Sequence, residues 1–159
     1  VLLAAIPKVY AALDGQVKFV LIGSGNVEEF KRQAGALGVW DHCYFTGFMS
    51  DEELNQFRVI ADCAVFPSLY EPFGIVVLEN FAARVPVVVS DTGGFPEIVR
   101  HGKSGIVTWT NNPDSLAWGI IEVLKNPDYM LWLVENAYED LERRFNWSKL
   151  AQQTEAVYH

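Results

Sequence analysis

The chain of 159 residues has the length of one ordinary domain, and half of its residues are apolar, which is enough to build a packed core. Its 20 acidic and 12 basic residues give a formal net charge of −8, which argues against nucleic acid as a partner because phosphates require a basic face. A nucleotide ligand remains compatible with this charge, since backbone N–H groups at a helix N-terminus can hold its phosphates.

The other compositional signals indicate an intracellular chain without a metal site. The two cysteines, Cys43 and Cys63, lie in or beside apolar segments and are interpreted as small buried residues of a reducing compartment. No CxxC pair or His/Cys cluster at metal-ligand spacing occurs, so no zinc site is expected. No apolar run approaches the ~20 residues that span a bilayer and no secretory signal is visible, so a cytoplasmic location is expected.

Apolar spacing and turn residues predict strands and helices in alternation. Ser50 and Glu53 match a capping box, in which each side chain satisfies a backbone N–H group of the other residue. In chain order the expected elements are a helix over 2–13, a strand over 17–22, a helix over 27–37, a strand over 44–46, a helix that begins after Ser50, a strand over 63–66, a helix over 73–84, a strand over 87–89, a helical turn over 96–100, a strand over 105–108, and helices over 112–124, 127–145 and 147–158.

The expected strands are continuous apolar runs, which is typical of a parallel sheet covered on both faces by helices. We therefore expect an α/β fold with a doubly wound parallel sheet, and a single domain over 1–159 because no linker or repeat interrupts the pattern. The chain opens inside a helix, although a βαβ unit needs a strand before that helix. The expectation is a fragment that lacks its first strand.

The stretch S-L-Y-E-P-F-G-I-V-V-L-E-N at 68–80 holds two acids, Glu71 and Glu79, around an almost wholly apolar run. Its β-branched residues could form a strand by local propensity. However, the apolar runs on either side are better strands, and parallel neighbours need a crossover between them, usually a helix. A helix that begins near Phe73 or Gly74 is therefore expected.

This helix would place Glu71 in a loop at the carboxyl edge of the sheet, where ligands of such sheets bind. The helix N-terminus directs free N–H groups at the same place, and Gly74 lets a ligand approach the backbone. Backbone N–H groups at 73–76 suit a phosphate or a sugar hydroxyl, while a carboxylate such as Glu79 suits a vicinal diol. Together they predict a nucleotide-sugar ligand, although either acid taken alone could be a solvated surface residue.

Two glycine loops at the same edge are further candidate sites. The G-S-G stretch at 23–25 follows a strand, but Glu28 stands where a dinucleotide fingerprint requires its third glycine and would repel a pyrophosphate, so an NAD site is not expected. The G-G pair at 93–94 also follows a strand, and either shapes the pocket or only turns the chain.

The chain carries an ordered set of motifs: F-V-L-I-G-S-G, Y-F-T-G-F-M-S-D-E-E-L, P-S-L-Y-E-P-F-G-I-V-V-L-E-N, V-P-V-V-V-S-D-T-G-G-F-P-E-I-V, H-G-K-S-G-I-V and R-R-F-N-W-S-K-L-A. This set resembles the retaining glycosyltransferases of the glycogen-synthase-like class, glycosyltransferase family 4, in which two glutamates are separated by seven residues. The resemblance covers nearly the whole chain and is far more specific than any single glycine motif. It implies a Rossmann-like GT-B fold, with this chain as most of the C-terminal, donor-binding domain of a two-domain enzyme.

The resemblance also implies how transfer proceeds and which residues line the donor site. Transfer would retain the anomeric configuration, need no metal or other cofactor, and be helped by donor phosphate oxygens instead of a protein base. By position, the implied set is Glu71 as the catalytic residue and, with Phe73 and Gly74, the contact to the donor sugar; Ile75 and Val76 at the diphosphate; and Glu79, Met49 and Gly23 at the ribose and base.

Two parts of the family pattern have no counterpart in this sequence. An Arg and a Lys that hold the diphosphate would lie before Val1, as would the acceptor-binding N-terminal domain. We therefore expect the isolated chain to transfer no sugar, and expect its partners to be a nucleotide-sugar donor and that N-terminal domain. Membrane contact, the base, the sugar and the acceptor stay open. The alternatives are a catalytically silent nucleotide-binding or regulatory module, and another nucleotide-sugar enzyme such as an epimerase, in which the acids would transfer protons.

Overall fold

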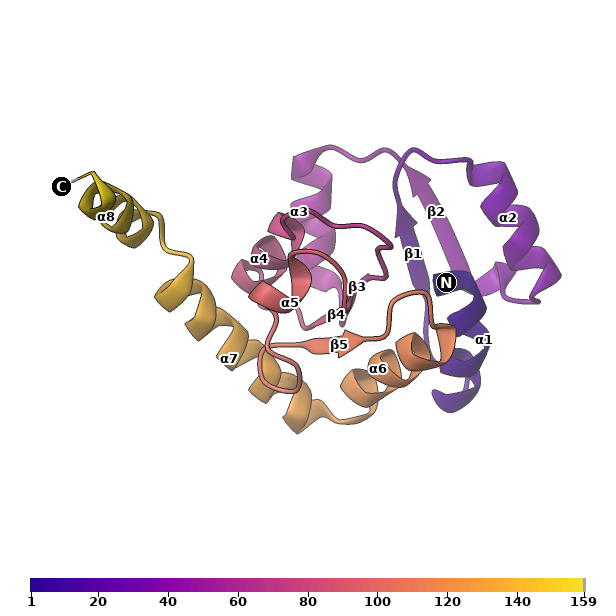
Figure 1. The fold of residues 1–159 in the computed structure, drawn as a ribbon. Coiled ribbons are helices and arrows are strands. Elements are labelled where there is room, and N and C mark those ends of the chain that lie inside the picture. The colour runs from indigo at the N-terminus through magenta and orange to yellow at the C-terminus, as the bar shows by residue number, and fades with distance from the viewer. Residues whose placement is uncertain (159) are drawn as a thin grey trace.

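A computed structural model describes residues 1–158 of the chain (Figure 1). Every predicted helix and strand is present, with ends that differ from the expected ranges by a few residues. A short 3₁₀ helix, η1 (Trp40–His42), was not expected. The other elements in chain order are α1 (Leu2–Ala12), β1 (Phe19–Ile22), α2 (Val27–Ala36), β2 (Cys43–Gly47), α3 (Asp51–Ile60), β3 (Ala64–Phe66), α4 (Ile75–Ala82), β4 (Val87–Ser90), α5 (Phe95–Ile98), β5 (Ile106–Thr108), α6 (Pro113–Lys125), α7 (Pro127–Arg144) and α8 (Trp147–Val157).

All strand pairs are parallel, as the continuous apolar strands predict, but they form two separate ladders. In the first, β4 lies between β3 and β5, and Val88 is opposite both Val65 and Ile106. In the second, β1 pairs with β2, beginning with Phe19 opposite Cys43. Within the part of the chain that the structure describes, no ladder joins the two groups, so the single continuous sheet that the sequence led us to expect is interrupted.

The core is built around β4, whose two faces pack against different helices. Val88 belongs to a buried cluster with residues of α1 and α6, including Ile6. Val87 and Val89 point the other way and belong to a second cluster with α4, α5 and α7, including Phe81. These three valines are all 0% exposed, and each contributes about 1.5–3 kcal/mol by burial. Helices therefore cover both faces of this ladder, as predicted for a doubly wound fold.

The amino end of α3 confirms the predicted capping box. The Ser50 hydroxyl accepts a hydrogen bond from the Glu53 N–H at 3.3 Å, and the Ser50 N–H donates to Glu53 Oε2 at 2.7 Å. The two side chains thus satisfy donors that a helix start leaves open, which explains why α3 begins at Asp51.

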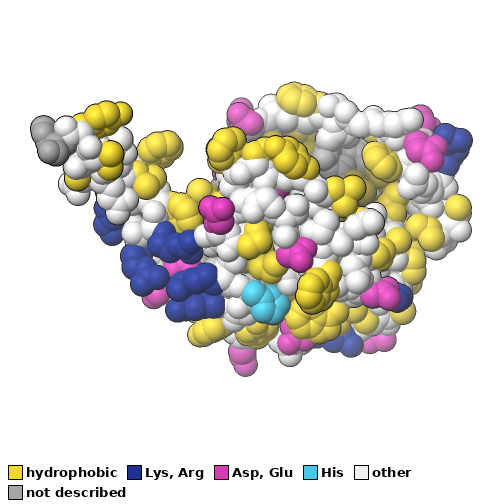
Figure 2. All heavy atoms as spheres, viewed as in Figure 1, with side chains coloured by type: hydrophobic (Ala, Val, Ile, Leu, Met, Phe, Trp, Pro, Cys, Tyr) yellow, Lys and Arg dark blue, Asp and Glu magenta, His cyan; other side chains and the backbone are white. Residues whose placement is uncertain are grey.

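The long helix α7 is fixed to the rest of the fold by a buried carboxylate. Asp140 is 1% exposed and accepts a hydrogen bond from Arg100 Nε at 2.7 Å, while Arg143 and Arg144 of α7 lie within 3.3 and 3.5 Å of it. Arg144 also donates to the Ile98 carbonyl at 3.2 Å. Basic side chains accordingly gather over this part of α7 (Figure 2). A buried carboxylate paired in this way ties α7 to the end of α5.

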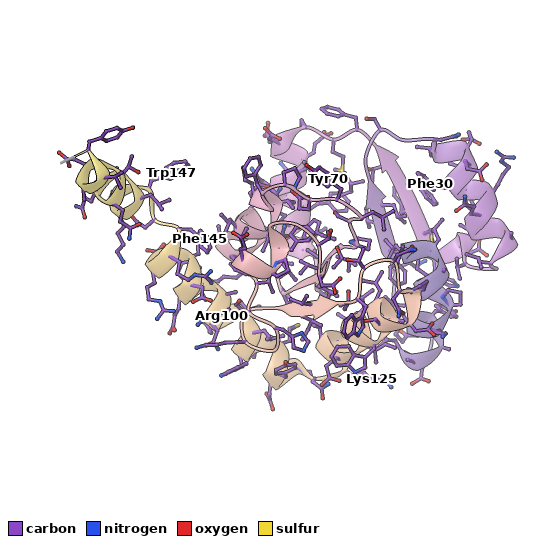
Figure 3. All side chains as sticks on the ribbon, viewed as in Figure 1. Phe30, Tyr70, Arg100, Lys125, Phe145 and Trp147 are labelled. Atoms are coloured by element: carbon purple, nitrogen blue, oxygen red, sulfur yellow. The ribbon has the colours of Figure 1, made fainter. Side chains whose placement is uncertain are left out.

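After α7 the chain turns at Phe145, and α8 extends away from the body of the molecule (Figures 1 and 3). Its apolar side chains are open to solvent, with Trp147 at 85%, Val157 at 83% and Tyr158 at 84% exposure. Asn146 caps the helix by accepting from the Ser148 N–H at 3.0 Å. Among residues 1–158, no helix has the length and apolar character that crossing a membrane requires.

Candidate functional site

The segment between β3 and β4 is a loop followed by a helix, as predicted, and not a strand. α4 begins at Ile75, one residue after Gly74, which adopts the left-handed conformation with φ of 76°. Gly74 is buried, and a Cβ atom there would lie 3.0 Å from Phe95 and 3.1 Å from Ile98. A glycine is therefore needed for two reasons: the positive φ and the close packing against α5.

Glu71 turns back onto the start of α4. Its Oε1 accepts a hydrogen bond from the Gly74 N–H at 2.9 Å and a longer one from the Phe73 N–H at 3.4 Å. The next two N–H groups, those of Ile75 and Val76, have no hydrogen-bond acceptor within residues 1–158. The helix start thus presents two unoccupied donors and the positive end of its dipole beside the Glu71 carboxylate.

The loop that carries Glu71 is held by the loop that follows β4. The buried Ser90 hydroxyl donates to the Ser68 carbonyl at 2.6 Å, the Thr92 hydroxyl donates to the Leu69 carbonyl at 3.3 Å, and the Gly94 N–H donates to the Glu71 carbonyl at 2.9 Å. The two parallel strands place these loops at one edge, so their side chains and backbones can bridge them.

Gly93 lets the two loops approach each other closely. It has φ of 53°, and a Cβ atom at this position would lie only 1.8 Å from the Glu71 carbonyl oxygen. At Gly94 a Cβ would lie 2.8 Å from the Phe73 carbonyl. The G-G pair therefore packs against the backbone of the Glu71 loop, because no side chain fits at either position. Its role in shaping a ligand pocket stays a prediction.

Glu79 lies on α4 and forms an ion pair with Arg58 of α3. The Arg58 side chain is 15% exposed and the Glu79 side chain 47%. Arg58 also donates to Asn55 of its own helix at 2.5 Å. The role of Arg58 cannot be predicted from the sequence, because the two partners are 21 residues apart on different helices and no local pattern joins them.

Gly23 and Met49 lie at the carboxyl end of the other ladder. The Gly23 N–H donates to the Gly47 carbonyl at 2.9 Å, which joins the ends of β1 and β2. Met49 follows two residues after Gly47 and is half-buried. Glu71, Phe73 and Gly74 thus form one hydrogen-bonded group and Gly23 with the β2 end forms another. Glu79 is bonded to neither group within the described residues.

Large apolar side chains surround these loops in the open. We define the apolar rim as Phe48 after β2, Tyr70 and Phe73 in the loop between β3 and α4, Ile75 at the start of α4, and Trp109 after β5. Their exposed fractions run from 61% for Ile75 to 81% for Tyr70. Tyr70 stands at the outer surface beside α3 and α4 in Figure 3. This rim cannot be recognised from the sequence, because apolar residues in loops give no periodic signal.

The comparisons with known proteins agree with this fold. The structure matches Anabaena HepE, solved in complex with UDP, with a TM-score of 0.83 and 27% identity over 96% of this chain and 44% of that chain. It also matches the C-terminal domain of a Francisella tularensis group 1 glycosyl transferase, LpcC, with a TM-score of 0.79 over 91% of this chain and 79% of that one, at 18% identity. The architecture is therefore that of a Rossmann-like GT-B C-terminal domain, as the motifs implied.

Sequence relatives identify the family. An uncharacterized glycosyltransferase of Methanocaldococcus jannaschii is 39% identical over 99% of this chain and 40% of its own length. A GDP-mannose-dependent phosphatidylinositol monomannoside mannosyltransferase of Mycobacterium tuberculosis is 31% identical over 94% of this chain and 41% of its own length. The profile of the glycosyl transferases group 1 matches residues 1–140, and the chain belongs to this family. It spans about two fifths of the length of these relatives.

Proposed function

We propose that this domain binds the nucleotide-sugar donor for retaining glycosyl transfer, and that an acceptor-binding N-terminal domain in a longer protein completes the enzyme. The observation that carries the proposal is the start of α4, where the free N–H groups of Ile75 and Val76 lie next to the Glu71 carboxylate. Unpaired N–H groups at a helix start bind anions, and a diphosphate is the anion at the centre of a nucleotide-sugar. Relatives and neighbours support this choice, because HepE was solved with UDP and UDP-glucose.

In the proposed complex, the sugar and the nucleoside of the donor bind on opposite sides of the start of α4. Glu71, with the backbone of Phe73 and Gly74, contacts the transferred sugar. One carboxylate oxygen, Oε1, is occupied by the N–H groups of the loop, and Oε2 has no partner within residues 1–158, so it is available to accept from a sugar hydroxyl. Holding that hydroxyl orients the anomeric carbon, which is the catalytic contribution proposed for Glu71.

The nucleoside half lies toward the other ladder. Glu79 accepts hydrogen bonds from the ribose diol, as its half-exposed carboxylate permits. Met49 and Gly23 line the base, where a glycine with open space around it leaves room for a flat ring. The apolar rim faces the N-terminal domain, because exposed apolar patches of this kind mark contacts with other domains. Transfer without a metal or other cofactor stays a prediction.

The test is a set of titrations of the chain with UDP, GDP and ADP and with their glucose or mannose conjugates. Glu79→Ala should weaken binding of the nucleotide about tenfold or more, whether or not a sugar is attached, because a hydrogen bond to a charged group is lost. Glu71→Gln should reduce only the gain in affinity that the sugar provides. Glu139→Ala on α7, an exposed acid far along the chain, is the control and should change neither affinity.

Two results would contradict the proposal. One is the absence of binding by all three nucleotides and their sugars. The other is an unchanged affinity for both glutamate variants. Sugar transfer by the isolated chain would contradict the narrower prediction that the N-terminal domain is needed, and would leave donor binding intact.

A further inference from the structure

The ion pair between Arg58 and Glu79 differs from the other arginine pairs of the molecule. Arg58 is the most buried arginine among the ion pairs of residues 1–158, with 15% exposure, whereas Arg84 and Arg32 are 47% and 76% exposed in theirs. Withdrawing a guanidinium from water is costly unless a carboxylate compensates it. Within the described residues, Glu79 is the carboxylate that does so.

The guanidinium is also fixed on its own helix. One of its nitrogens, Nη1, donates to Asn55 Oδ1 at 2.5 Å, and the other, Nη2, donates to Glu79 Oε2. The hydrogen bond to Asn55 orients the planar guanidinium on α3. The guanidinium in turn fixes the position of the Glu79 carboxylate on α4.

Arg58 leaves most hydrogen-bonding positions of the Glu79 carboxylate unoccupied. A carboxylate offers about four lone-pair positions, and Arg58 takes one of them, on Oε2. Glu79 Oε1 accepts no hydrogen bond within residues 1–158, and the side chain is 47% exposed. A vicinal diol needs two positions, so a ribose can bind while the ion pair stays in place.

We propose that Arg58 is a positioning residue for Glu79, and that it sets how strongly the site prefers a ribonucleotide to a deoxyribonucleotide. The inference rests on the proposed function, since it requires Glu79 to bind a ribose. A carboxylate already held in its bound orientation loses less side-chain freedom on binding, and the saving per immobilised side chain corresponds to about two- to tenfold in affinity. That gain is present only when the ligand has both hydroxyls.

A purely structural clip between α3 and α4 would act differently. Loss of Arg58 would then lower the stability of the fold but would weaken ribonucleotides and deoxyribonucleotides by the same factor. The ratio of the two affinities therefore separates the positioning role from the structural one.

The experiment titrates the chain with UDP, GDP and ADP and with the 2′-deoxy form of each, for the wild type, Arg58→Met, Arg58→Lys, Glu79→Gln and the double variant R58M/E79Q. The matched control is Arg84→Met, which removes another arginine ion pair, formed with Glu135 of α7 just after the C-terminal end of α4. We expect R58M to reduce the ribo-to-deoxy affinity ratio about two- to tenfold, R58K to restore part of it, and R84M to leave it unchanged. The double variant should show the ratio of E79Q alone.

The outcomes are distinct. A ratio that falls in E79Q but stays at the wild-type value in R58M and R58K overturns the role of Arg58 and leaves the proposed function standing. A ratio unchanged in E79Q overturns the ribose contact of Glu79, and with it the role of Arg58, but leaves donor binding at the start of α4 standing. No binding by any nucleotide overturns both the role of Arg58 and the proposed function. Circular dichroism shows whether R58M is folded. If R58M does not fold, the affinity ratio of R58K is compared with that of the wild type instead, because lysine keeps the positive charge but lacks the planar guanidinium.

Discussion

Gly93 offers the sharpest test of how the Glu71 loop is held. Replacing it with alanine places a methyl group 1.8 Å from the Glu71 carbonyl oxygen, at a residue with φ of 53°. The left-handed conformation alone costs a non-glycine residue roughly 1–2 kcal/mol. The overlap must also push the two loops apart, which breaks the 2.9 Å hydrogen bond from the Gly94 N–H to Glu71 and costs about 1 kcal/mol more.

The expected loss of stability for Gly93→Ala is therefore about 2–3 kcal/mol. Gly38→Ala is the matched control, because Gly38 has φ of 68° with nothing within 4 Å of a Cβ atom, so only the conformational cost remains. Urea unfolding of both variants gives the difference, which we expect to be about 1 kcal/mol or more. G93A should also lose the part of the donor affinity that depends on the sugar, while G38A should retain it.

Equal destabilisation by the two substitutions would refute this reasoning. It would mean that the loops move apart without cost, and that the contact seen between Gly93 and Glu71 does not fix the carboxylate. Normal sugar-dependent affinity in G93A would refute the link between this contact and donor binding.

Two further predictions concern ionisable groups. Hydrogen bonds from the backbone and side chain of Ser50 hold the pKa of Glu53 below its usual value. Its stabilising effect should therefore be full above the ordinary carboxyl pKa and be lost as the pH falls through the lowered one, so the difference in urea midpoint between wild type and Glu53→Gln should shrink in acid. Burial, with the nearby charge of Asp62, raises the pKa of Cys63 to about 12. At pH 8 the folded chain should therefore alkylate at Cys63 far more slowly than the urea-unfolded chain, measured by mass spectrometry of the peptides; equal rates would contradict this.

Local signals in the sequence predicted most of the elements. The Ser50–Glu53 capping box lies within four consecutive residues, so the local sequence alone predicts it. α4 needed context, because its own residues favour a strand and only the neighbouring strands decide for a helix. The left-handed Gly74 at its start was expected as a close approach for a ligand, and its packing against Phe95 adds a structural reason.

The features that escaped prediction all join distant parts of the chain. The Arg58–Glu79 pair and the contact of Gly93 with Glu71 each bridge about twenty residues, and neither leaves a periodic trace. The division into two ladders escaped for a related reason: an apolar run indicates that a strand is buried, but not which strand lies beside it. Likewise, the pattern of α8 predicted a helix but not that its Trp147 would be open to solvent.

The separation of the two ladders affects which parts of the molecule open together in local unfolding. Within residues 1–158, no ladder of backbone hydrogen bonds ties β1–β2 to β3–β4–β5, and side-chain packing of Phe19 and Cys43 with Val88 joins the two groups instead. We therefore expect the two groups to open as separate cooperative units. Fluctuation of the first group would displace Gly23, while the Glu71 loop, anchored through Ser90 to the central strand, stays in place. In the proposed donor placement, the sugar would therefore be held by a more rigid part of the molecule than the base.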